Sequence, residues 1–281
     1  MNKQAPTTLV LGSTGKTGSR VVADLINRSL PVRTAARSRA DVAFDWSQRD
    51  SYARALDGIG HVYLVAPVMR LDFAGDVSAF LDEAEAAGVQ HLVFLSAYGM
   101  EHALNEVATR SVELDLLHRQ RIGHTILRPA WFMQNFSETF LKPIDAAIFV
   151  PTGDGAEAFI DAEDIASVAA TILADPQAHA GAAYSLTGPE ALTVAEAASI
   201  ISDETGSTIK HVNLDRDDWV AGAIANGIPP EYGPVLRQLT ETIASGHGSR
   251  PNGIVEKITG TPPHTFRNFA RNNANAWKAA K

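Results

Sequence analysis

Residues 11–18 read LGSTGKTG, and two interpretations of this stretch lead to different proteins. Taken through Gly15-Lys16-Thr17, it ends like the phosphate-binding loop of nucleotide triphosphatases. Taken through Gly12, Gly15 and Gly18, it is a glycine pattern of the kind that binds dinucleotides. The residues on either side decide between the two.

The flanking residues favour the dinucleotide interpretation. A phosphate-binding loop needs a glycine five residues before Gly15, where this chain has Val10, and no apolar strand obviously ends in a magnesium-binding Asp. The run Thr8–Leu11 instead leads straight into Gly12, and a helix is expected from near Lys16. Glycines allow the backbone to approach a pyrophosphate closely, and the helix amino terminus offers it free N–H groups. The predicted cofactor contacts here are Gly12, Ser13, Thr14, Gly15, Lys16, Thr17 and Gly18.

That loop departs from the usual GxGxxG spacing, so a plain strand–helix turn is the alternative. Lys16 is interpreted as a solvent-facing residue near the phosphates and not as a catalytic lysine.

The amino-acid composition limits the class of protein, its partners and its chemistry. The chain has 281 residues, 45% of them hydrophobic and 20% charged, as in ordinary globular proteins. The net charge of −8 and the lack of a dense basic run argue against a nucleic-acid partner. The absence of cysteine excludes disulfides and thiolate chemistry. The start MNKQAPTTLV has no signal-peptide core and no apolar run could span a bilayer, so we expect a cytoplasmic protein without a membrane partner.

Short β-branched runs alternate with amphipathic stretches through the first half of the chain. The expected strands are Thr8–Leu11, Val32–Ala35, a short third strand that ends at 44–46, His61–Val65, Leu92–Leu95 and Thr125–Leu127, and the expected helices cover about 17–29, 48–57, 73–87 and 104–120. This alternation predicts βαβ units, and hence an α/β fold with a Rossmann-type doubly wound parallel sheet.

The second half is less regular. It offers helices near 162–174 and 194–205, strands at Tyr184–Thr187 and 210–214, and two later helical stretches. Gly188-Pro189 is a clear break. We therefore expect an NAD(P)-binding Rossmann domain over 1–187, with 129–160 lining the substrate pocket, and a smaller C-terminal substrate-capping lobe over 188–281.

The end of the second strand indicates which dinucleotide is bound. NAD-selective sites usually carry an acidic residue there for the ribose hydroxyls, but this chain reads Ala36-Arg37-Ser38-Arg39, with no acid until Asp41. Arginine offers planar paired donors to a phosphate, so Arg37, Ser38 and Arg39 favour NADP(H) over NAD(H), with a solvated basic turn as the alternative. Further cofactor contacts are expected from Asp45 and Trp46 at the adenine and from Ala66 and Pro67 after the fourth expected strand.

At this point the chain resembles a known family. The strings GSTGKTGSRV, FDW, VYLVAP, LVFLSAYG, HTILRPAWFMQNF, AFIDAEDIA and YSLTGPEALT are similar to those of NmrA-like atypical short-chain dehydrogenases/reductases, especially the ergot-alkaloid-type reductases and their bacterial relatives. The resemblance implies hydride transfer from NADP(H) or NAD(H) to C=N, C=C, C=O or quinone groups. Some members of the family only bind the cofactor and act as regulators.

The acid usual in short-chain dehydrogenases is missing from this chain. These enzymes commonly protonate substrate with the Tyr of a YxxxK motif. The five tyrosines are Tyr52, Tyr63, Tyr98, Tyr184 and Tyr232, and none of them is followed four residues later by Lys.

The candidates near the nicotinamide follow the fifth expected strand. Ser96 matches the strand-end serine of the family, Ala97 borders the cofactor, and Arg110 stands roughly where many relatives carry Lys. Tyr98 or His102 could protonate a substrate; alternatively, Tyr98 only lines the pocket and His102 lies on a solvated loop. Reduction of an iminium needs hydride alone, so the missing acid favours C=N, quinone or conjugated alkene substrates.

Residues 128–136, RPAWFMQNF, follow the sixth expected strand and crowd aromatic side chains together. In this family the segment passes beside the nicotinamide, which makes Pro129 a cofactor contact and Trp131, Phe132, Met133 and Phe136 the substrate wall. The alternative is that these aromatics form the buried stripe of a helix. Arg128 and Asn135 are expected to be structural, as are Asp161 and Asp164, and no cluster has convincing metal spacing.

Three functions fit these features to different degrees. The first is an NADPH-dependent reductase of a small, fairly apolar molecule, using Ser96, Tyr98 and His102 at its catalytic centre. The second is an NADP(H)-sensing regulator without turnover. The third, an epimerase or dehydratase, would normally keep YxxxK. Residues 228–250 could close the pocket or form a subunit contact, so a homodimer is one alternative.

Overall fold

A seven-stranded sheet organises the first part of the chain. The computed structural model describes residues 5–277. The strands are β1 (Thr8–Leu11), β2 (Val32–Ala36), β3 (Val42–Ala43), β4 (His61–Val65), β5 (His91–Leu95), β6 (Gly123–Pro129) and β9 (Ala183–Leu186). Their order is β3-β2-β1-β4-β5-β6-β9, and the neighbours from β3 to β6 pair in parallel. The order of the first six is that of the doubly wound dinucleotide-binding fold, which confirms the predicted Rossmann-type sheet.

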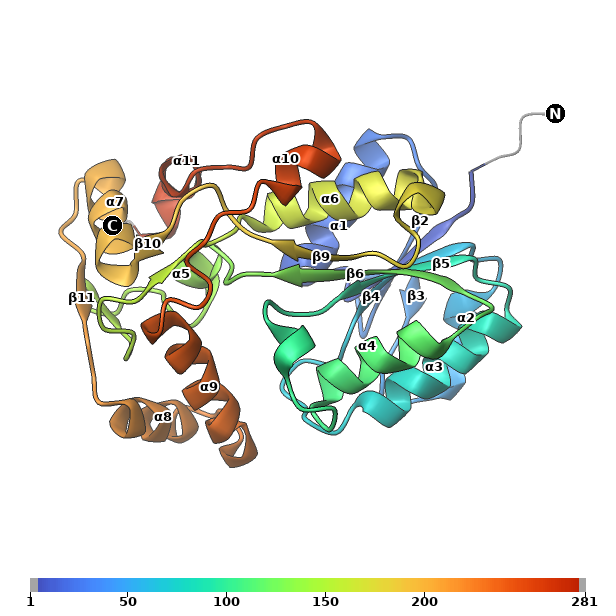
Figure 1. The fold of residues 1–281 in the computed structure, drawn as a ribbon, viewed down its shortest axis with the longest axis horizontal. Coiled ribbons are helices and arrows are strands. Elements are labelled where there is room, and N and C mark those ends of the chain that lie inside the picture. Colours follow the sequence, from blue (N-terminus) through green and yellow to red (C-terminus); the bar gives the residue numbers. More distant parts are fainter. Residues whose placement is uncertain (1–4, 278–281) are drawn as a thin grey trace. The chain divides into compact units, whose positions relative to one another are not determined.

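Helices cover both faces of this sheet (Figure 1). One face carries α1 (Lys16–Asn27) and α6 (Ala162–Ala174), and the other carries α2 (Asp50–Leu56), α3 (Ala74–Ala86) and α4 (Ala108–His118). Two short 3₁₀ helices, η1 (Met100–His102) and η2 (Pro176–His179), lie in the connections. Strands buried on both faces read as continuous apolar runs, and β1 and the first four residues of β4 and β5 are fully buried.

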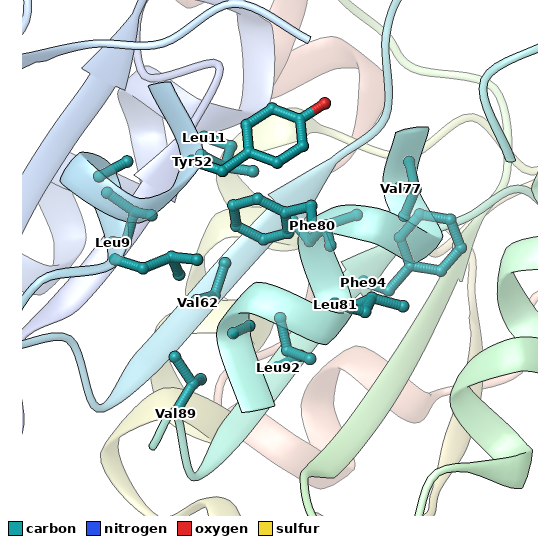
Figure 2. Packing of buried hydrophobic residues seen from close by; sticks show 14 of the residues in the cluster. Leu9, Leu11, Tyr52, Val62, Val77, Phe80, Leu81, Val89, Leu92 and Phe94 are labelled. Carbon is teal, nitrogen blue, oxygen red and sulfur yellow. The ribbon is translucent and has the colours of Figure 1, made fainter. Parts of the chain in front are cut away.

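The core between the sheet and the α2–α4 layer is packed from both sides. Figure 2 shows Leu9, Val62 and Leu92 of adjacent strands beside Phe80 and Leu81 of α3. All five side chains are inaccessible to solvent. This burial gives the carboxyl ends of the strands fixed positions, which a cofactor site requires.

The chain divides into two compact units, each built from two segments. The first unit comprises Met1–Pro129 and Ala162–Ser185, and the second comprises Ala130–Asp161 and Leu186–Lys281. The sequence interpretation instead placed one boundary after residue 187, so the two divisions differ over 130–161. The roles of the two parts as cofactor domain and substrate cap remain predictions.

The second unit contains short strands and helices around its own core. Its elements are α5 (Asn135–Glu138), β7 (Ala147–Phe149), β8 (Ala156–Glu157), β10 (Leu192–Thr193), α7 (Val194–Thr205), β11 (Lys210–Val212), α8 (Arg216–Ala225), η3 (Pro230–Tyr232), α9 (Gly233–Ala244), α10 (Ile254–Thr259), α11 (Phe266–Asn272) and η4 (Ala274–Ala276). β10 pairs with β8 and β11 with β7. The two expected late helical stretches are four α-helices in the structure, α8 to α11.

Aromatic side chains from both segments meet in this second core. The ring of Phe136 makes edge contacts with Phe159 at 5.1 Å and with Phe266 at 4.9 Å between centroids. The indole N–H of Trp277 donates to the Phe136 carbonyl at 2.7 Å. Residues 130–161 therefore pack with the C-terminal residues of the chain, which accounts for the discontinuous division.

Candidate functional site

The glycine loop lies at the carboxyl end of β1, and each glycine in it is needed for a different reason. Gly12 has φ +62°, in the left-handed region that favours glycine. Gly15 caps α1, and its N–H donates to the Gly12 carbonyl at 2.8 Å. A Cβ on Gly18 would lie 2.2 Å from the Gly12 oxygen. At Gly18 the start of α1 thus packs too closely against the loop for a side chain, as expected where a backbone receives a pyrophosphate.

The other loop residues fix this conformation or face outward. The Ser13 hydroxyl donates to the Ala35 carbonyl of β2 at 3.2 Å, which ties the loop to the adjacent strand. Thr17 is buried, Thr14 is exposed, and Lys16 is the half-buried first residue of α1. The loop is therefore held in place from within the protein.

The turn between β2 and β3 presents Arg37, Ser38 and Arg39 to solvent. Within residues 5–277, neither guanidinium makes an ion pair or a side-chain hydrogen bond, so both are available to a ligand. The carboxylate of Asp41 accepts from the Thr34 N–H at 2.9 Å and from the Thr34 hydroxyl at 2.8 Å. These hydrogen bonds lower the pKa of Asp41, and they engage the nearest acid in the turn itself.

The two predicted adenine contacts, Asp45 and Trp46, also interact with neighbouring residues of the protein. Asp45 Oδ1 accepts from the Ser47 N–H at 2.9 Å and from its hydroxyl at 2.7 Å, which lowers the pKa of Asp45. The half-buried Trp46 makes edge contacts with Phe44 and Phe80. Ala66 and Pro67 are half-buried directly after β4.

A buried ionic cluster joins the carboxyl ends of β5 and β6 to α4. Glu113, on α4, has no exposed surface. Its carboxylate accepts from the Ser96 hydroxyl at 2.6 Å, from Arg110 Nη1 at 2.8 Å and from Arg128 Nε and Nη2, both at 2.8 Å. Burial would raise the pKa of Glu113, but the hydrogen bonds from Arg128, Ser96 and Arg110 outweigh it and lower that pKa. The carboxylate is therefore ionised at neutral pH.

This cluster changes how two sequence candidates are understood. Arg110, in the place of the family's lysine, pairs with Glu113. Arg128, expected to tie loop backbone, binds the Glu113 side chain instead, and its Nη1 lies 3.4 Å from Glu101 Oε2. Glu113 was not among the candidates, although an acid between the buried Val112 and Leu116 positions of one helix was a usable signal.

The two candidate proton donors lie in the connection after β5. The Tyr98 N–H donates to the carbonyl of Pro129, the buried last residue of β6, at 3.0 Å, and Tyr98 is half-buried, as is the preceding Ala97. His102 ends η1 and is exposed. The structure therefore brings Ser96, Ala97, Tyr98 and Pro129 to the ends of two adjacent strands, with His102 on the loop beyond.

The predicted substrate wall lies in the second unit and divides into two kinds of residue. Met133 and Phe136 are completely buried in the core of that unit. Trp131 and Phe132 are only half-buried. Of the four, Trp131 and Phe132 are the side chains with surface to offer a ligand.

Glu157 is a buried acid in the same unit that the sequence did not single out. One oxygen accepts only from the Trp131 N–H, at 3.3 Å, and the other has no hydrogen-bond partner. Burial raises the pKa of Glu157 to about 7, although the Trp131 bond opposes this shift. A Cβ on Gly248 would lie 2.2 Å from Glu157 Oε2, so glycine is the residue that can cover this carboxyl group.

The described residues contain neither a metal-binding cluster nor a membrane-spanning helix. No group of three or more His, Asp or Glu side chains in residues 5–277 is arranged to hold a metal ion. No helix in that part of the chain has the length and apolar character to cross a membrane.

Comparison with known proteins agrees with this geometry. Residues 12–176 match the model of a family described as NAD(P)H-binding. An uncharacterized oxidoreductase of Bacillus subtilis, YesF, is 35% identical over 99% of this chain and 98% of its own length. Festuclavine dehydrogenase of Aspergillus fumigatus is 32% identical over 96% of this chain and 99% of its own.

Solved structures share the fold. The NADPH-dependent quinone oxidoreductase QOR2 of Escherichia coli, solved with NADPH, has a TM-score of 0.79 at 20% identity, covering 95% of this chain and 99% of its own. NmrA, a negative transcriptional regulator solved with NAD, has a TM-score of 0.76 at 15% identity, covering 96% and 95%.

The glycine loop, the strand order and the family match define an NAD(P)H-binding protein with a Rossmann-type fold. The chain belongs to this NAD(P)H-binding family, together with relatives that are named oxidoreductases and dehydrogenases. The predicted family and the predicted cofactor class are confirmed.

Proposed function

We propose that the protein is an NADPH-dependent reductase that transfers hydride to a small, fairly apolar organic molecule bearing a C=N, quinone, conjugated C=C or C=O group. One observation carries the proposal. Two unpaired arginines stand at the carboxyl end of β2, beside a glycine loop at the end of β1, in a chain without YxxxK. The name of the festuclavine dehydrogenase relative supports a small-molecule substrate.

The chain's own residues would hold the cofactor at the point where the strand order reverses, between β1 and β4. The loop from Gly12 to Gly18 would receive the pyrophosphate, and Arg37 and Arg39 the 2′-phosphate. The bound nicotinamide supplies the hydride. Asp41, the first acid after Arg37, directs its Oδ2 to Thr34, and this contact holds the carboxylate at the strand and supports NADPH over NADH.

The substrate class follows from what the strand ends can donate. Ser96 donates its hydroxyl proton to Glu113, and Arg110 is too weak an acid to protonate a substrate, which leaves Tyr98 and His102 as candidate acids. A substrate that accepts hydride without protonation, such as an iminium ion, would not need either. We therefore place iminium ions ahead of ketones as substrates, and quinones as well, because hydride transfer to a quinone leaves a stabilised hydroquinone anion that solvent can protonate.

The first test is NADPH consumption by the purified protein across a panel of imines, quinones, enones and ketones, with NADH in parallel. Turnover of one class would establish the reductase and its chemistry. Tight NADPH binding without turnover of any compound would instead favour an NADP(H)-sensing regulator.

The cofactor preference has its own test in Arg37→Ala. A charged hydrogen bond contributes about 1.5–3 kcal/mol, so the variant should bind NADPH roughly tenfold or more weakly while NADH binding stays unchanged. Arg54→Ala, an exposed arginine of α2, is the matched control. Equal losses for both cofactors would remove the argument for 2′-phosphate recognition.

A further inference from the structure

The hydrogen bonds around Glu113 leave no acceptor position open. Oε1 receives the Ser96 hydroxyl at 2.6 Å and Arg128 Nε at 2.8 Å. Oε2 receives Arg110 Nη1 and Arg128 Nη2, both at 2.8 Å. An ionised carboxylate has about four lone-pair sites, so these four donors saturate it.

This saturation determines which way the Ser96 proton points. An ionised carboxylate only accepts, so in the 2.6 Å contact Ser96 must be the donor. Two arginines hold Glu113 in its ionised form, and a hydrogen bond to an ionised group is stronger than a neutral one. The Ser96 N–H is also engaged, since it donates to the Leu127 carbonyl at 2.7 Å. Both donors of Ser96, the hydroxyl and the backbone N–H, are therefore used within the protein. Only the lone pairs of the hydroxyl oxygen remain for a ligand.

We infer that Ser96 is a hydrogen-bond acceptor in the active site and receives an N–H group of the bound ligands, and that Glu113 is the positioning residue that sets this polarity. The inference rests on the proposed function, in which the reacting end of the cofactor lies at the carboxyl ends of β5 and β6. Ser96 then neither protonates a substrate nor polarises a carbonyl oxygen. Its partner is the carboxamide N–H of the nicotinamide or an N–H of the substrate.

The test compares NADPH with its 3-acetylpyridine analogue, in which a methyl group replaces the carboxamide nitrogen and removes its N–H donors. A hydrogen bond of ordinary strength corresponds to about fivefold in binding. Ser96→Ala should bind NADPH about fivefold more weakly than the wild type and bind the analogue equally well. Ser96→Ala leaves Glu113 its three arginine hydrogen bonds, so the fold should survive.

The substrate arm of the test distinguishes the second source of the N–H group. If the substrate supplies it, Ser96→Ala leaves the dissociation constants of both cofactors unchanged. It then raises KM for an iminium substrate that carries an N–H, but not for its fully N-methylated counterpart, which has none. Either result supports the inference, and the two results distinguish a nicotinamide N–H from a substrate N–H as the donor to Ser96.

Glu113→Gln tests the positioning role. An amide N–H facing Ser96 frees the hydroxyl proton to turn outward, so this variant should lose the discrimination between the N–H ligand and its analogue. Glu83→Gln, on the exposed face of α3, is the control. The melting temperatures of all variants distinguish a loss of the fold from a change in the direction of the Ser96 hydrogen bond.

Several outcomes would overturn the inference. One is equal weakening of both cofactors by Ser96→Ala with no substrate selectivity, and another is unchanged discrimination in a folded Glu113→Gln variant. Wild-type protein that binds NADPH without discriminating against the analogue or the N-methylated substrate defeats this inference alone. Wild-type protein that fails to bind NADPH defeats the proposed function as well.

Discussion

Gly18 is the position where a single methyl group should damage the cofactor site most directly. Its Cβ would lie 2.2 Å from the Gly12 oxygen and 2.7 Å from the Gly12 carbonyl carbon, both backbone atoms that cannot rotate away. Gly18→Ala should therefore displace the loop, lower the melting temperature and weaken NADPH binding at least tenfold, as measured by fluorescence titration.

Gly75 offers the matched control. It lies near the start of α3, where a Cβ would have no atom within 4 Å, and alanine is favoured over glycine in a helix by about 1 kcal/mol. Gly75→Ala should leave binding unchanged and stability unchanged or raised. Unaltered NADPH binding by Gly18→Ala would contradict the assignment of this loop.

Glu157 should make the protein less stable as pH rises. Its pKa is raised from an ordinary 4.5 to about 7 by burial, so the folded state holds a proton that the unfolded state has released. The stabilising contribution is fully present below pH 4.5 and is lost as pH rises through 7. The loss between pH 5 and pH 8 is roughly 2–3 kcal/mol.

Glu157→Gln removes this titration while keeping the side-chain size. The free energy of unfolding of the wild type, relative to Glu157→Gln, should fall by that amount between pH 5 and pH 8 in urea titrations. Glu231→Gln, on the exposed surface, should show no such change. A difference that stays constant with pH would mean that Glu157 is ionised in the folded protein.

At the scale of elements, the amino ends of β4, β5 and β6 bring three buried histidines together, beside the half-buried His179. His61 and His91 begin the first two strands, His124 is the second residue of the third, and His179 lies in η2. Thr125 donates its hydroxyl proton to the His179 carbonyl at 2.9 Å, so it must accept from His91 Nε2, also at 2.9 Å. A Cβ on Gly123 would lie 2.8 Å from His91 Nδ1, which shows how closely the backbone covers the second nitrogen.

His91 should therefore destabilise the protein in acid. Burial, followed by the charges of His61, His124 and His179, lowers the pKa of His91 to about 4. Its contribution to stability is present above pH 6.5, the ordinary value, and is lost as pH falls towards 4. Between pH 7 and pH 5 the loss is roughly 2 kcal/mol.

His91→Gln keeps an N–H donor for Thr125 but does not titrate. Unfolding free energies at pH 7 and pH 5 should fall more steeply for the wild type than for this variant, by about 2 kcal/mol. Because the effect of Glu157 runs the opposite way with pH, each residue is compared with its own variant at the same pH. The exposed His118→Gln is the control, and parallel pH profiles for wild type and His91→Gln would exclude this role.

The bounds of strands and helices were predicted best for elements whose side chains are fully buried on at least one face. The expected bounds of β1, β4, α6 and α7 agree with the structure residue for residue, because buried strands are continuous apolar runs and amphipathic helices have strong periodicity. β7, β8 and β10, of two or three residues each, carry no periodicity of their own and were not expected. The Glu113 cluster was missed because Ser96 and Arg128 reach the helix only through packing of the strands against it, although the spacing of Arg110 and Glu113 on α4 was visible.

At the scale of the whole molecule, the discontinuous division of the chain bears on where it can be cut. The core of the second unit takes Met133, Phe136 and Phe159 from residues 130–161 and Phe266 and Phe269 from α11. A chain shortened to residues 1–187 would keep the first three side chains and lose their partners. Exposed apolar surface of this kind promotes aggregation.

We therefore expect residues 1–187 to bind the dye ANS, to aggregate and to melt without cooperativity.

The matched variant joins residue 129 to residue 162 through about ten Gly and Ser residues and ends at 187. It keeps β1 to β6 and β9, with every predicted cofactor contact from Gly12 to Pro129. This variant should melt cooperatively in circular dichroism and bind NADPH, since its core is complete without 130–161. Size-exclusion chromatography of both variants and of the full chain also tests the homodimer alternative. If residues 1–187 fold cooperatively and the linked variant does not, the single boundary after residue 187 is the physical one, and residues 130–161 belong with the cofactor domain.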